Sequence, residues 1–101
     1  MAQIAVKITG IARGIQGATF TWSQQIKPLV DFGGGNLQTS FLSDPGTFLY
    51  SLVVFGPPGD AWTLLVTDGT TVHNHAGHMS PAGFDTTGDT AFTVVNPVVN
   101  P

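Results

Sequence analysis

The 101-residue chain contains no cysteine and no glutamate. Without cysteine it can form neither a disulfide scaffold nor a thiolate metal site, and it has no thiol nucleophile. A chain of this length can bury roughly two-thirds of its unfolded surface in one core, so it does not need disulfides to fold. We therefore expect a single domain over residues 1–96, followed by an extended, proline-containing tail over residues 97–101.

Charge is also scarce: only 9% of the residues are charged, against about 25% in ordinary domains. The basic residues are Lys7, Arg13 and Lys27, too few to form a basic patch. This excludes nucleic-acid binding by phosphate neutralisation and binding to anionic membrane surfaces. The sequence has no apolar run long enough for a transmembrane helix and no basic-then-apolar start typical of a signal peptide, and it indicates no compartment.

The residues that are present favour strands and turns. All six acidic residues are aspartates, and each lies near glycine, proline, serine or threonine, where a short carboxylate accepts hydrogen bonds from nearby backbone amides. Glutamate and lysine, which favour helices, are absent or rare. The 13 glycines fit the same pattern of strands joined by tight turns.

Alternating apolar and polar residues mark the individual strands. The segments expected to be strands are residues 2–11, 18–23, 25–30, 37–42, 47–55, 61–67, 70–75 and 90–95. Pro28 predicts a sheet edge for the third of them, and Asp68-Gly69 predicts a two-residue hairpin turn. Short strands at this spacing indicate an all-β fold: an antiparallel β-sandwich, jelly-roll or immunoglobulin-like, of about eight strands.

The segment from Thr47 to Phe55 is apolar on both faces. Such a strand is expected at the centre of a sheet with both faces covered. In a two-layer sandwich, one face of such a strand packs against the other sheet. Its second apolar face would be covered by a partner subunit, by another part of this chain or by an unusual loop. This strand is the main sequence argument for a homo-oligomer.

Three histidines lie within six residues. On a strand, His73 and His75 share one face, and a bend at Ala76-Gly77 would return His78 to the same place. Three imidazoles suit zinc or copper, so the cluster is a candidate metal site; the alternative is an exposed strand end whose histidines are merely polar. No glutamate can act as a base and no serine lies in a nucleophile elbow, so we do not expect an enzyme.

Two loops are candidate ligand sites. Asp85 and Asp89, with nearby threonines, could bind calcium, but the spacing is not that of an EF-hand, and capping of the loop's own backbone is the favoured interpretation. The glycine-rich loop holding Phe32 and Asn36 is followed by a strand rather than a helix, which argues against a phosphate loop. With Phe84, these residues form the candidate ligand-binding set.

Trp22, Trp62 and Tyr50 form an aromatic set that could line a sugar-binding face. Trp22 and Trp62 share their strand faces with apolar residues, so both tryptophans are expected in the core instead. Three functional hypotheses follow from the sequence. The first is a non-catalytic binding module for a ligand such as a carbohydrate; the second is a structural or assembly subunit of a homo-oligomer; the third is a small metal-binding protein using the three histidines.

Overall fold

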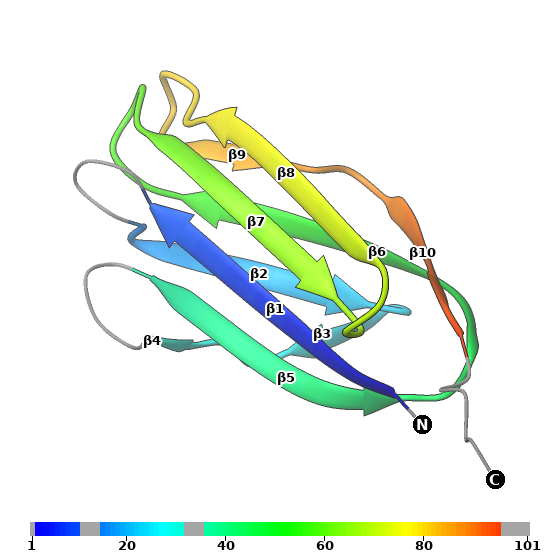
Figure 1. Cartoon of the computed structure of the whole chain (residues 1–101). Helices are drawn as coiled ribbons and strands as arrows, with labels where there is room; N and C mark the ends of the chain where they lie inside the picture. The colour runs from blue at the N-terminus through cyan, green and yellow to red at the C-terminus, as the bar shows by residue number, and fades with distance from the viewer. Residues whose placement is uncertain (1, 11–14, 32–35, 96–101) are drawn as a thin grey trace, which may run out of the picture.

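The computed structural model describes residues 2–10, 15–31 and 36–95, which form ten strands in two antiparallel sheets packed face to face (Figure 1). The first, here called the β1 sheet, has the order β4 (Val30–Asp31), β5 (Leu37–Ser43), β1 (Ala2–Gly10), β7 (Ala61–Thr67) and β8 (Val72–His78). The second, the β6 sheet, has the order β10 (Thr90–Val94), β6 (Gly46–Phe55), β2 (Gly17–Trp22) and β3 (Gln25–Lys27), with β9 (Phe84–Thr86) also paired to β6. The predicted all-β antiparallel sandwich is confirmed.

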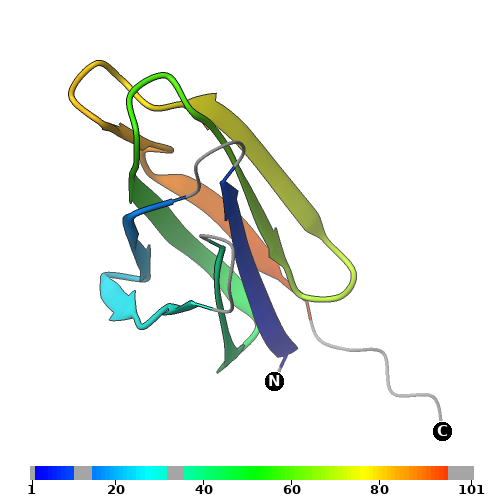
Figure 2. The same cartoon turned by 90° about the vertical axis from the view of Figure 1, so that its left-hand side faces the viewer.

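The two layers are clear in the turned view of Figure 2. Successive strands repeatedly change sheet, from β1 to β2, from β3 to β4, and from β5 through β6 to β7. This alternation is typical of jelly rolls. The described residues contain no helix that could cross a membrane. The expected tail over residues 97–101 lies outside the described part of the chain.

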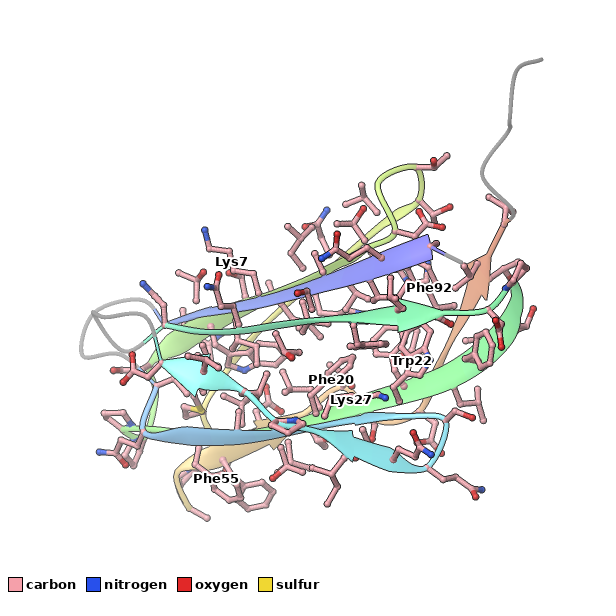
Figure 3. The ribbon with its side chains drawn as sticks, turned by 90° about the horizontal axis from the view of Figure 1, so that it is seen from below. Lys7, Phe20, Trp22, Lys27, Phe55 and Phe92 are labelled. Atoms are coloured by element: carbon pink, nitrogen blue, oxygen red, sulfur yellow. The ribbon has the colours of Figure 1, made fainter. Side chains whose placement is uncertain are left out.

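The core lies between the sheets and is built from alternate residues of each strand. Phe20, Trp22 and Phe92 point into this space, whereas Lys7 and Phe55 lie on opposite outer faces (Figure 3). Both tryptophans are buried, as predicted, and so is Tyr50. Each large apolar side chain that is fully buried stabilises the fold by about 1.5–3 kcal/mol, so the alternating pattern is the main source of stability.

The predicted strand over residues 25–30 is instead two strands in different sheets. β3 pairs with β2, and β4 pairs with β5. Pro28 lies between them, and because proline has no backbone N–H, it interrupts a hydrogen-bonded ladder. The chain therefore crosses between the sheets at this point, which raises the strand number above the expected eight.

The loop expected over residues 76–88 is shorter than predicted. β8 continues to His78 because β7 offers partners along its whole length, ending with the pair Ala61 and His78. β9 pairs with the end of β6, where Phe55 lies opposite Phe84. The hairpin between β7 and β8 has four loop residues rather than two, since Thr67 pairs with Val72 and the Asp68 carboxylate accepts hydrogen bonds from the amides of the loop.

Strand β6 is central, as expected, with β2 on one side and β9 and β10 on the other. Its inward residues Tyr50, Leu52 and Val54 are buried. On the outer face, Leu49 is 55% exposed and Phe55 is 45% exposed. Within the described chain, the second apolar face of this strand is thus not covered.

Candidate functional site

The most concentrated group of chemically active side chains lies between the sheets at the β8 edge. The Tyr50 hydroxyl, from β6, lies 3.0 Å from Nδ1 of His73 and 2.6 Å from Nε2 of His75, both from β8. The alternation of β8 places both histidines on one face, as the sequence predicted, and in the structure this face points between the sheets. Tyr50 supplies the partner that the sequence did not identify.

The hydroxyl group of Tyr50 forms hydrogen bonds of opposite direction with the two imidazoles. A tyrosine hydroxyl has one hydrogen, so it donates to one imidazole nitrogen and accepts the N–H of the other. Burial raises the pKa of Tyr50 to about 12. Burial, together with the nearby charge of His73, lowers the pKa of His75. Near neutral pH Tyr50 is therefore a neutral phenol, whose oxygen lies within hydrogen-bond distance of one nitrogen of each imidazole.

Aromatic rings hold the three side chains in place. The Tyr50 ring stacks on Phe20 and Trp22, with ring centroids 5.8 Å and 6.2 Å apart. The His73 ring lies 4.6 Å from the ring of Phe92. Tyr50 is 1% exposed, whereas the two histidines are half-buried beneath the edge strand. Tyr50 is thus enclosed by the core, whereas both histidines keep part of their surface exposed to solvent.

His78 does not join this group. The expected bend at Ala76-Gly77 is absent because β8 remains paired to β7 through these residues. Strand alternation then places His78 on the outer face of the β1 sheet, opposite to His73 and His75. Among the described residues, no three histidine or aspartate side chains are close enough together to hold a metal ion.

Asp85 also points between the sheets rather than toward solvent. Its Oδ2 accepts a hydrogen bond from Nε1 of Trp62 at 2.9 Å, and its Oδ1 accepts one from the Thr86 amide. Asp89 is exposed. Thr86 and Thr87 bond to the backbone of the same loop and of Leu52. These bonds match backbone capping, the interpretation that the sequence favoured over a calcium site.

The remaining candidate ligand residues are dispersed. Phe32 lies outside the described residues. Asn36 Oδ1 accepts a hydrogen bond from the Gly10 amide at 3.3 Å, which ties the loop to the end of β1. An open hollow of about 400 Å³ lies over β4 and β5, lined by Val30, Gln38, Thr39 and Ser40. None of the predicted ligand residues lines it.

Phe84 is exposed, as expected, but on a strand rather than in a loop. It lies opposite Phe55, and the two rings are 43% and 45% exposed on the outer face of the β6 sheet. The side chains of this outer face are Thr19, Thr21, Ile26, Thr47, Leu49, Ser51, Val53, Phe55, Phe84, Thr86, Ala91 and Thr93. None of them carries a charge.

The sequence contained signals for the residues that it did not assign. Tyr50 stands at an inward position of a buried strand, and a buried tyrosine hydroxyl needs a hydrogen-bond partner. An inward polar residue of the opposite sheet is one candidate for this partner. No family model matches the chain, and neither a curated protein nor a solved structure matches it. Its functional assignment therefore depends on the geometry described above.

Proposed function

We propose that this protein is a structural subunit that self-associates through the outer face of its β6 sheet. The observation that carries the proposal is the uncharged outer face of this sheet, on which Ile26, Leu49, Phe55 and Phe84 are between 43% and 70% exposed. Exposed apolar patches of this kind are typical of interaction sites. The remaining side chains of the face are small or are threonine, serine and valine.

The outer face of the other sheet provides a contrast. It carries Lys7 on its central strand, with Gln3, Gln38 and Asn74 around it. Leu42, Val30 and Val72 are also exposed on this face, so exposed aliphatic side chains occur on both sheets. The two outer faces differ in that the face of the β1 sheet carries a charge, whereas the exposed aromatic pair Phe55 and Phe84 lies on the β6 sheet. Only the β6 sheet combines large exposed apolar residues with a complete absence of charge among its described outer positions.

A second copy of the chain is the partner that this face fits. In a two-fold dimer the same patch contacts itself, so a charged patch would place like charges together, whereas an uncharged one leaves no charge buried and unpaired. The sheet is ten residues long at β6 and four strands wide. The neighbouring strands are shorter, and the five strands of the sheet hold 27 residues, which correspond to about 430 Å² per copy at about 3.3 Å per residue and 4.8 Å per strand. Two copies would bury about 860 Å², the size of a weak, concentration-dependent interface.

We expect the Phe55–Phe84 pair to contribute most of the free energy of association. Aromatic residues dominate the energetics of interfaces, and paired rings offer a large contact area at low cost in conformational entropy. The pair lies near the end of β6, and Leu49 lies six residues away on the same face. The apolar contact would therefore extend along most of the length of the strand.

Light scattering coupled to size exclusion, over concentrations from micromolar to millimolar, tests the proposal. We expect a dimer or larger oligomer that Leu49→Asp dissociates. Leu42→Asp is the matched control, because Leu42 is 65% exposed on the outer face of the β1 sheet and its change adds the same charge. A strict monomer, or equal effects of the two variants, would overturn the proposal. A monomer that polysaccharides retain through Phe55 and Phe84 would overturn it in favour of carbohydrate binding.

A further inference from the structure

We infer that Tyr50, His73 and His75 form a binding site for a divalent copper ion, which uses the phenol oxygen and the two imidazole nitrogens as ligands. The inference is independent of self-association, because the site lies between the sheets whereas the proposed interface lies on an outer face. It differs from the three-histidine site expected from the sequence, since Tyr50 takes the place of His78.

The three donor atoms converge on one place. The Tyr50 oxygen lies 2.6 Å and 3.0 Å from the two nitrogens, which are the lengths of hydrogen bonds. Neighbouring ligands of a metal ion with bonds of about 2.0 Å lie about 2.8–3.3 Å apart, so small shifts of the side chains would let one ion replace the protons between them.

The ligand types indicate which ion this is. Imidazole nitrogen and phenolate oxygen suit divalent copper, which also binds such donors more tightly than the other divalent first-row metals. Tyr50 is fixed by its stacking on Phe20 and Trp22, so the oxygen is already in position before an ion binds. The half-buried histidines lie on the edge strand, where an ion and a water ligand can enter from solvent.

The proton balance of binding is simple. The copper–oxygen bond replaces the O–H bond of Tyr50, and this proton leaves to solvent. The imidazole that donated its N–H to Tyr50 moves that proton to its other ring nitrogen, which frees the facing nitrogen for the ion. Binding therefore releases one proton per ion and involves no change in oxidation state.

Titration of tag-free protein with copper(II), as its weak glycine complex, tests the inference. We expect one ion per chain, a phenolate-to-copper charge-transfer absorption band and nitrogen hyperfine splitting in the electron paramagnetic resonance spectrum. Tyr50→Phe should abolish the band. His73→Gln and His75→Gln should each weaken binding at least about tenfold.

His78→Asn is the matched control, because it removes a histidine of the same strand that faces the other way. We expect it to leave both the affinity and the band unchanged. Tyr50→Phe retains the buried ring and reports on the oxygen alone; circular dichroism verifies that each variant is folded. A wild-type complex without the band, a band that persists in Tyr50→Phe, or a loss of affinity in His78→Asn equal to that in His75→Gln would overturn the inference.

Discussion

The indole N–H of Trp62 donates a hydrogen bond to Oδ2 of Asp85 at 2.9 Å, joining β7 of one sheet to β9 of the other. Gly77 of β8 lies directly against this pair: a methyl group at its Cα would overlap the Asp85 carboxylate and come within 3.0 Å of the Trp62 ring. The absence of a side chain at residue 77 thus makes room for a polar link between the sheets.

Gly77→Ala is expected to destabilise the protein by about 1–3 kcal/mol, because an added methyl in a filled space displaces its neighbours. Urea denaturation followed by tryptophan fluorescence measures the loss. Gly17→Ala is the control, since an added methyl there meets no atom within 4 Å. Similar stabilities for the two variants would contradict the close packing at Gly77.

Asp85→Ala should cost about 1–3 kcal/mol of unfolding free energy, because it leaves the buried indole N–H of Trp62 without its acceptor. Asp85→Asn retains an oxygen at this position and should cost less. Asp89→Ala, at an exposed position between β9 and β10, should change stability by no more than about 0.5 kcal/mol. Thermal denaturation of the three variants provides the comparison. An Asp85→Ala variant as stable as Asp89→Ala would refute the structural role of Asp85.

The turn between β2 and β3 offers a stabilising change. Ser23 and Gln24 form a two-residue turn with φ values of 49° and 66°, a left-handed conformation that side chains other than asparagine and glycine adopt at a cost. Replacing the pair by Asn-Gly should raise the free energy of unfolding by about 0.5–1 kcal/mol. Gly69→Ala should lower the free energy of unfolding, because Gly69 has a φ of 92°, which alanine adopts only at a cost. The added methyl itself would meet no atom within 4 Å. A higher urea midpoint with an unchanged slope is the expected result for the Asn-Gly variant, and a lower midpoint would contradict it.

Asp68 should make the protein less stable in acid. Burial tends to raise the pKa of this carboxyl, but hydrogen bonds from backbone amides, chiefly those of Thr71 and Thr70, outweigh burial and hold the pKa below its ordinary value. Because the folded pKa is the lower one, the unfolded chain binds more protons as the solution is acidified. The stabilisation is therefore complete above the unfolded pKa and is lost as the pH falls from about 5 through the folded pKa.

Urea denaturation at a series of pH values compares the wild type with Asp68→Asn, which retains an oxygen acceptor but has no charge to titrate. The wild type should be the more stable protein at pH 7, and the difference should shrink in acid. Asp44→Asn removes one charge from another, exposed turn and controls for the change in net charge. A difference between wild type and Asp68→Asn that stays constant with pH would contradict this role.

Much of the architecture is predictable from local pattern alone. Scarce helix formers, aspartates at turns and alternating apolar residues, such as Ile4, Val6 and Ile8, indicate two layers of strands, because the direction of successive side chains is a local property of extended backbone. The same property places His73 and His75 on one common face. The errors in strand position fall at Pro28, which divides a strand, and at Ala76-Gly77, where pairing to β7 outweighs a local preference for loop.

The sequence by itself determined the all-β class, the inward residues of most strands and the common side of His73 and His75. Only the tertiary structure decided what these residues meet: Tyr50 lies 23 and 25 residues away from the two histidines along the chain, and Trp62 lies 23 residues from Asp85. It also decided that Leu49 and Phe55 stay exposed, because no described part of the chain packs over the outer face of β6. The physical reason is that the backbone sets the direction of each side chain locally, whereas the packing of one sheet against the other sets its neighbours.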